Sequence, residues 1–223
     1  MIRFRTLLRA EWAIVGPLPW IFLSISLLAV GLTHGVLEQA ARWPDPLVEN
    51  AEAFLPLALA LSAAPLLTIE YDQGMIELSP RLPLRRSLHL RWLAVWGPFF
   101  LISAVGLRVM THFFGTVNGW SLALAVLGPG AFLGGLSLLA ASLSGKAAVG
   151  YVSAIALVVA DLVLRGLGLF ASAPRLQWIN AFAYRWQLPA PAWQGVSLAQ
   201  LAAGFVLMEA TILLAPRLYR RLL

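Results

Sequence analysis

The chain has 223 residues, of which 60% are hydrophobic and only 12% are charged. Soluble domains carry about 25% charged residues, so this composition excludes an ordinary soluble domain and favours an integral membrane protein. The absence of cysteine excludes disulfides, thiolate metal sites and cysteine nucleophiles. The net charge of +6 lies mainly between apolar runs, which favours contact with lipid headgroups and not with nucleic acid.

The first dozen residues, MIRFRTLLRAEW, fit a short amphipathic helix in the cytoplasmic interface. Its apolar face would carry Phe4, Leu7, Leu8 and Trp12. A charged start to the first span is the alternative interpretation. The apolar run that follows is longer than a signal-peptide core and lacks a small-residue cleavage site, so we expect a retained membrane span.

Apolar runs near twenty residues predict six transmembrane helices in a single all-α domain covering residues 1–223. The expected spans are residues 13–34, 53–69, 92–113, 121–143, 147–170 and 198–216. Pro56 and Pro65 interrupt the second run and make its bounds the hardest to place. Small residues in GAFLG, at 130–134, favour close helix packing.

Six spans put both termini on one side of the membrane. The opposite side carries three basic residues: Arg42, Arg175 and Arg185. The side with the termini carries eleven: Arg3, Arg5, Arg9, Arg81, Arg85, Arg86, Arg91, Lys146, Arg217, Arg220 and Arg221. Because basic loops stay in the cytoplasm, we expect a multi-pass protein of the inner (plasma) membrane with both termini cytoplasmic.

Two longer loops would then lie outside, at residues 38–52 and 171–197. The first, EQAARWPDPLVENAE, is acidic. The second contains Trp178, Trp186 and Trp193, so it could enter the outer headgroup layer as short helices, because indole favours the interface. A solvated loop is the alternative.

Four charged residues fall within the predicted spans: Arg108, Asp161, Arg165 and Glu209. A lone charge at mid-bilayer costs about 2.5–3.5 kcal/mol, so such residues are candidates for pairing or for a substrate path. Asp161 and Arg165 are four residues apart and share a helix face, and we expect Asp161 to pair with Arg165 or Arg108. Glu209 has no obvious partner and would face a second subunit or the substrate path.

Patterns for metal binding and ATP binding are missing. ASLSGKAA, at 141–148, resembles half a P-loop, but Ala140 and Ala147 replace the required glycine and Ser or Thr. The three histidines offer no paired ligand set for haem.

Ser137 and His112 are the best remaining catalytic pair, so a membrane-embedded enzyme acting on lipid or peptide is an alternative function.

The stretch EYDQGMIELSPRLPLRRS, at residues 70–87, forms the longest predicted cytoplasmic loop. Glu70, Gly74, Glu77 and Pro83, followed by Arg91, have a spacing that resembles the membrane subunits of ABC-2 type transporters. In that family this loop reads roughly Glu-x-x-x-Gly-Thr-x-Glu, with a proline and a basic residue opening span three.

Met75 replaces the usual threonine of that pattern, and Pro80 is an additional proline. The resemblance also covers the amphipathic start, the six spans and the long loop before the last span. It implies an all-α permease subunit of an exporter, with a short coupling helix between spans two and three. The loop suits that role physically, because Gly74 permits a turn and the two prolines would end a short helix.

The resemblance further implies that a separate cytoplasmic ATPase subunit binds ATP and magnesium and that the coupling helix docks on it. A second permease subunit, identical or different, would complete the transporter, and this chain would bind no cofactor and carry no catalytic residue. The transported substrate is left open. A structural subunit of another membrane complex is the remaining alternative.

The predicted orientation can be tested with single introduced cysteines. Cysteines near residues 5, 84 and 220 should be shielded from an impermeant thiol reagent in intact cells, whereas cysteines near residues 45 and 190 should react, because the basic loops stay inside. Labelling at residue 84 from outside would contradict both the orientation and the assignment of a cytoplasmic coupling loop.

Overall fold

The computed structural model describes residues 9, 12–13, 15–33, 45–68, 84–114, 117–169, 180–184 and 190–222. No strand occurs among these residues. The helices are α2 Leu18–Leu32, α3 Asp45–Ala63, α5 Leu84–Phe114, α6 Gly119–Ser144, α7 Ala147–Gly166 and α9 Ala190–Leu222, and a 3₁₀-helix, η3, continues α3 over Ala64–Leu66. The expected all-α fold is confirmed.

Five helical stretches are long and apolar enough to cross a membrane. They are Leu47–Leu66, Arg85–His112, Gly119–Ser144, Ala147–Gly166 and Pro191–Ala215. Helix α2 is apolar but has only 15 residues, about 22 Å of helix against a hydrocarbon core of about 30 Å. It begins after Gly16, whose φ of 69° is left-handed, and Pro17. The membrane-spanning character is thus supported, but the predicted count of six is not confirmed.

Three helices begin earlier in the chain than predicted. Helix α3 starts at Asp45, inside the expected outer loop 38–52, and α9 starts at Ala190. Helix α5 starts at Leu84, so His89 and Arg91 lie on a helix and not in a loop. Charged residues near the starts of α3 and α5 gave these two segments the composition of loops. The start of α9 carries no charge, but Pro189, Pro191 and Gly195 are typical of loops. The predicted N-terminal helix falls mostly outside the described residues.

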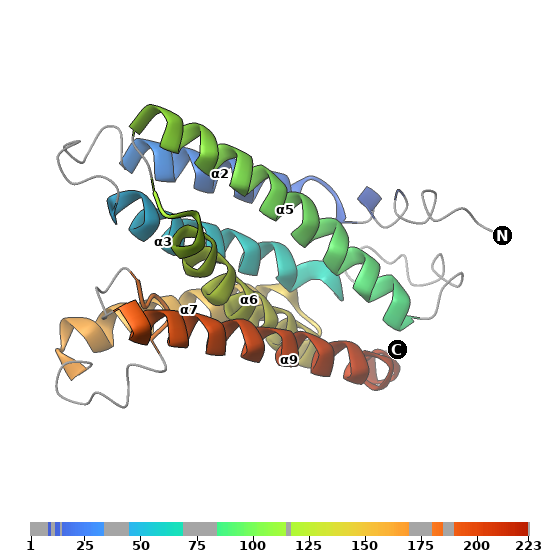
Figure 1. Cartoon of the computed structure of the whole chain (residues 1–223). Helices are drawn as coiled ribbons and strands as arrows, with labels where there is room; N and C mark the ends of the chain where they lie inside the picture. Colours follow the sequence, from blue (N-terminus) through green and yellow to red (C-terminus); the bar gives the residue numbers. More distant parts are fainter. Residues whose placement is uncertain are drawn as a thin grey trace.

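Consecutive helices run alternately along the bundle, so α2 begins and α9 ends at the same end (Figure 1). We call the end where α3 stops and α5 starts the loop end, and the end where α5 stops and α6 starts the far end. At the loop end, Gly145 closes α6 with a φ of 69° and allows the two-residue turn into α7. Helix α6 lies in the middle and packs against α3, α7 and α9.

Glycines allow the neighbours of α6 to approach closely. A Cβ on Gly135 would lie 2.6 Å from the Gly204 carbonyl oxygen of α9. On another side of α6, a Cβ on Gly130 would lie 3.1 Å from Leu59 of α3, and one on Gly134 would lie 3.2 Å from Trp96 of α5. The two glycines of GAFLG therefore have a packing role, as predicted.

The outward faces of α5 and α7 are apolar. Their exposed side chains include Leu93, Leu101, Val105, Val109, Val152, Ile155, Val159 and Leu162. An apolar surface of this extent is unfavourable in water but suits contact with lipid or with another membrane subunit.

Leucine substitutions can test the close contact between α6 and α9. Gly135→Leu and Gly204→Leu should each lower the stability by about 1–3 kcal/mol or more, because overpacking forces the backbones apart. The measurement is the thermal unfolding midpoint in detergent. Gly97→Leu is the matched control, because nothing lies within 4 Å of a Cβ built there. Equal midpoints for all three variants would contradict the close contact.

Candidate functional site

Arg91 links α5 to the end of η3. Its side chain is only 1% exposed, and Nη1 donates a hydrogen bond to the Leu66 carbonyl oxygen at 3.1 Å. The last carbonyls of a helix have no partner within it and carry a partial negative charge. A guanidinium group therefore satisfies this end of η3 and holds it against the start of α5.

This bond lies at the base of the predicted coupling loop. Leu66 precedes residues 69–83, and α5 follows them directly. Of the residues that resemble the transporter motif, the structure thus places Arg91 at the base of the loop. Glu70, Gly74, Glu77 and Pro83 lie outside the described residues.

At the far end, residues 180–184 form a non-helical segment buried among α3, α7 and α9. Asn180, Ala181, Phe182 and Ala183 are each at most 2% exposed. Short helices in the outer headgroup layer were one expectation for residues 171–197. For these five residues that expectation is wrong, because they are irregular and lie inside the bundle.

Side chains from three helices satisfy the backbone of this segment. The Asp161 carboxylate, on α7, accepts a bond from Ala181 N at 2.8 Å, and the Glu52 carboxylate, on α3, accepts one from Tyr184 N at 2.9 Å. Gln200 Nε2, on α9, donates to the Asn180 carbonyl at 2.6 Å. Irregular backbone is tolerated at membrane depth only where the protein supplies such partners. The three helices therefore hold the segment in place.

The sequence identified Asp161 as a candidate site residue but gave no such role to Glu52. Asp161 is 3% exposed, as expected for a face turned inward, and a backbone amide is one of its partners. Its pairing with Arg165, which is half-buried one turn later, stays a prediction. Glu52 had been placed in the outer loop, although the Asp-Pro start at Asp45 is typical of a helix N-terminus and could have revealed the longer helix.

Glu209 has a partner that the sequence did not suggest. Its Oε1 lies 3.1 Å from His89 Nε2, and both side chains are 48% exposed. His89 Nδ1 lies 2.7 Å from the Arg85 carbonyl oxygen. The imidazole ring therefore lies between the Glu209 carboxylate and a backbone carbonyl of its own helix. The pair connects α5 with α9 near the loop end, at an exposure where an ion pair contributes little stability.

Ser137 and His112 lie toward opposite ends of the bundle. The Ser137 hydroxyl is fully buried and donates to the Gly150 carbonyl of α7 at 2.9 Å. His112 is near the end of α5, whereas Ser137 lies 18 residues into α6, about 27 Å along that helix. The Ser137 hydroxyl therefore has a packing role. The separation of the two residues gives no support for a catalytic pair of Ser137 and His112. In the described part of the chain no three His, Asp or Glu residues form a metal site.

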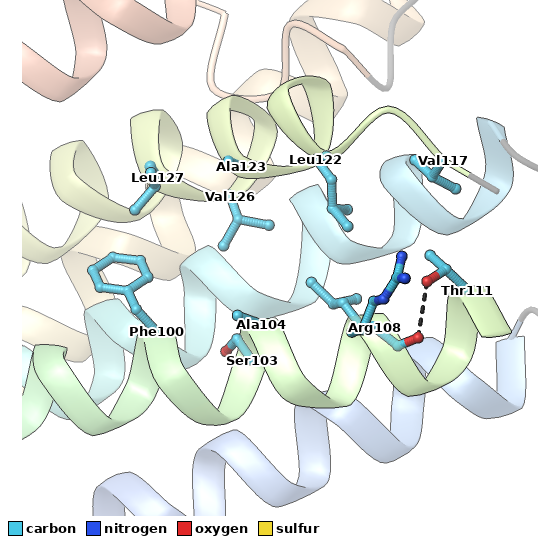
Figure 2. Close-up of a pocket in the computed structure, with 12 residues that line it drawn as sticks. Phe100, Ser103, Ala104, Arg108, Thr111, Val117, Leu122, Ala123, Val126 and Leu127 are labelled. Carbon is cyan, nitrogen blue, oxygen red and sulfur yellow. Dashed lines mark hydrogen bonds between the residues drawn. The ribbon is translucent and has the colours of Figure 1, made fainter.

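Arg108 lies on α5 and lines a cavity between α5 and α6 (Figure 2). Its backbone carbonyl accepts a hydrogen bond from the Thr111 hydroxyl at 2.9 Å. The structure thus does not gather the four charged residues into one site, because Asp161 contacts the buried segment and Glu209 contacts His89.

Comparison with protein-family models, with curated proteins and with solved structures found no match for this chain.

Substitutions at Asp161 can separate its role as a hydrogen-bond acceptor from its role as a charge. Asp161→Ala should lower stability by about 1–3 kcal/mol, because Ala181 N–H would be left buried without this partner. Asp161→Asn keeps an acceptor oxygen and should retain most of the stability. Thermal unfolding in detergent and protease cleavage near residues 180–184 are the measurements. Equal damage by both variants would contradict the acceptor role and favour a charge pair with Arg165.

Proposed function

We propose that this chain is the permease subunit of an ATP-driven exporter of the ABC-2 type. The observation that carries the proposal is the buried hydrogen bond from Arg91 to Leu66 at the base of loop 69–83. A coupling element must pass movement to the helices without loss. The bond supports this role because it makes the end of η3 and the start of α5 respond together.

The packing of the helices provides a route for such movement. Helix α3, which leads into the loop, packs along α6, and α6 packs along α9. A displacement of the loop end would therefore reach the helices that hold segment 180–184 at the far end. Close packing transmits such strain because protein interiors have low compressibility.

The proposed assembly contains a separate cytoplasmic ATPase subunit, which binds ATP and magnesium, and a second permease subunit. The exposed apolar faces of α5 and α7 offer surfaces for that second subunit or for lipid. The protein would lie in the inner (plasma) membrane with both termini in the cytoplasm, and loop 69–83 would dock on the ATPase.

Charge reversal at Glu77 tests docking directly. Glu77→Arg should reduce the amount of co-purified ATPase by about tenfold or more, because breaking a buried charge pair at an interface costs about 2–5 kcal/mol. Gly74→Val should have a similar effect through the backbone angle. The measurement is the recovery of a P-loop ATPase with tagged permease from native membranes. Asp72→Arg, the same reversal at a position that the family pattern leaves unspecified, is the control and should leave recovery unchanged.

Arg91→Gln tests transmission in the same assay. This variant leaves the loop sequence intact, so the ATPase should still co-purify. ATP hydrolysis in lipid discs should, however, no longer be coupled to the permease, because the bond at the base of the loop is lost. Size-exclusion chromatography checks that the variant remains folded. Normal docking and normal coupled hydrolysis in the Glu77, Gly74 and Arg91 variants together would contradict the proposed function.

A further inference from the structure

A cavity of about 320 Å³ lies between α5 and α6 toward the far end of the bundle. Most of its wall is apolar, with Phe100, Leu107, Leu122 and Val126 among the lining residues (Figure 2). Ligand cavities in proteins measure about 300–1,000 Å³. This one is therefore at the small end of that range and suits one hydrocarbon chain better than a large rigid molecule.

Two polar side chains line the same cavity. Arg108 is exposed, and in the described part of the chain no carboxylate forms an ion pair with its guanidinium group. Ser103 is only 3% exposed, and its hydroxyl has no hydrogen-bond partner among the described residues. A buried hydroxyl without a partner is unfavourable, so this group is available to a ligand.

The positions of Arg108 and of the apolar wall along α5 match the polar headgroup and the hydrocarbon chain of an amphiphile. Arg108 lies four residues before the end of the apolar stretch Arg85–His112, about 6 Å from its end and close to the headgroup region. Phe100 lies eight residues earlier, about 12 Å deeper. The cavity thus has a cation near the interface and an apolar wall below it.

The cavity is reached from the outside of the bundle. Ala104 and Arg108, which line it, are both exposed on α5, beside the apolar outer face that carries Leu101 and Val105. A molecule in the surrounding leaflet could therefore enter laterally, without crossing the packed interior between α3, α6 and α9.

We propose that this cavity binds an anionic phospholipid of the surrounding leaflet. Its phosphate would contact the Arg108 guanidinium, which is well suited to phosphate oxygens. One acyl chain would lie between α5 and α6, and the Ser103 hydroxyl would donate to an ester oxygen of the lipid. The site does not depend on the proposed export function, since lipid binding can be measured on the permease alone.

Native mass spectrometry of the purified chain tests this proposal with added phosphatidylglycerol, phosphatidylcholine or oleate. The wild type should retain one phosphatidylglycerol in preference to phosphatidylcholine. Arg108→Gln should reduce this retention about tenfold or more, and Arg108→Lys should retain most of it, because the positive charge remains. Ser103→Ala should reduce it a few-fold. Arg86→Gln removes an exposed arginine at the other end of α5 and should change nothing.

Filling the cavity tests the place of the acyl chain. Ala123→Phe, and the smaller change Ala123→Val, should lower retention of phosphatidylglycerol while the unfolding midpoint without lipid stays close to that of the wild type. Retention unchanged in a folded filling variant would overturn the site. Equal retention of the two phospholipids, or unchanged retention in Arg108→Gln, would also overturn it. Displacement of phosphatidylglycerol by an equal concentration of oleate would overturn the phospholipid assignment and indicate a carboxylate amphiphile.

Discussion

Backbone groups in the apolar interior of this bundle need hydrogen-bond partners, because a buried N–H or C=O without one is strongly unfavourable. Helices satisfy this requirement internally, but segment 180–184 and the end of η3 do not. At these two places polar side chains supply the partners. Asp161 and Glu52 accept bonds from the segment, and Arg91 donates to Leu66. The same bonds explain why three charged side chains are tolerated inside an apolar bundle.

Helix α6 holds the rest of the architecture together. Its glycines bring α3 and α5 close on one side and α9 close on another, so its sequence is apolar on all faces, as expected for a helix surrounded by others. Its packing connects α3, which precedes residues 69–83 in the chain, with α9, which contacts segment 180–184. In the proposed transporter this connection would carry movement from the ATPase to the opposite end of the bundle.

The two ends of the bundle carry different chemistry. The loop end has basic groups in defined contacts, with Arg91 bonded to η3 and His89 facing Glu209. The far end has carboxylates that hold a buried segment. It also has a separate cavity between α5 and α6 that Arg108 lines. In the proposed transporter the loop end would contact the ATPase, whereas the far end holds segment 180–184 and carries the cavity proposed to bind lipid.

Local properties of the sequence determined that this chain is rich in helices apolar and long enough to span a membrane, because apolar run length and scarcity of charge need no knowledge of neighbours. They also marked Asp161 as a charge within a predicted span, whereas Arg91 was singled out by the resemblance of its region to a transporter motif. The starts of α3 and α5 were misplaced because their charged residues have the composition of loops, and the start of α9 was misplaced because its proline and glycine residues are typical of loops. Glu52 finds its partner 132 residues away, and Glu209 finds His89 120 residues away. Only the tertiary structure decides such contacts, because each depends on where a distant segment packs.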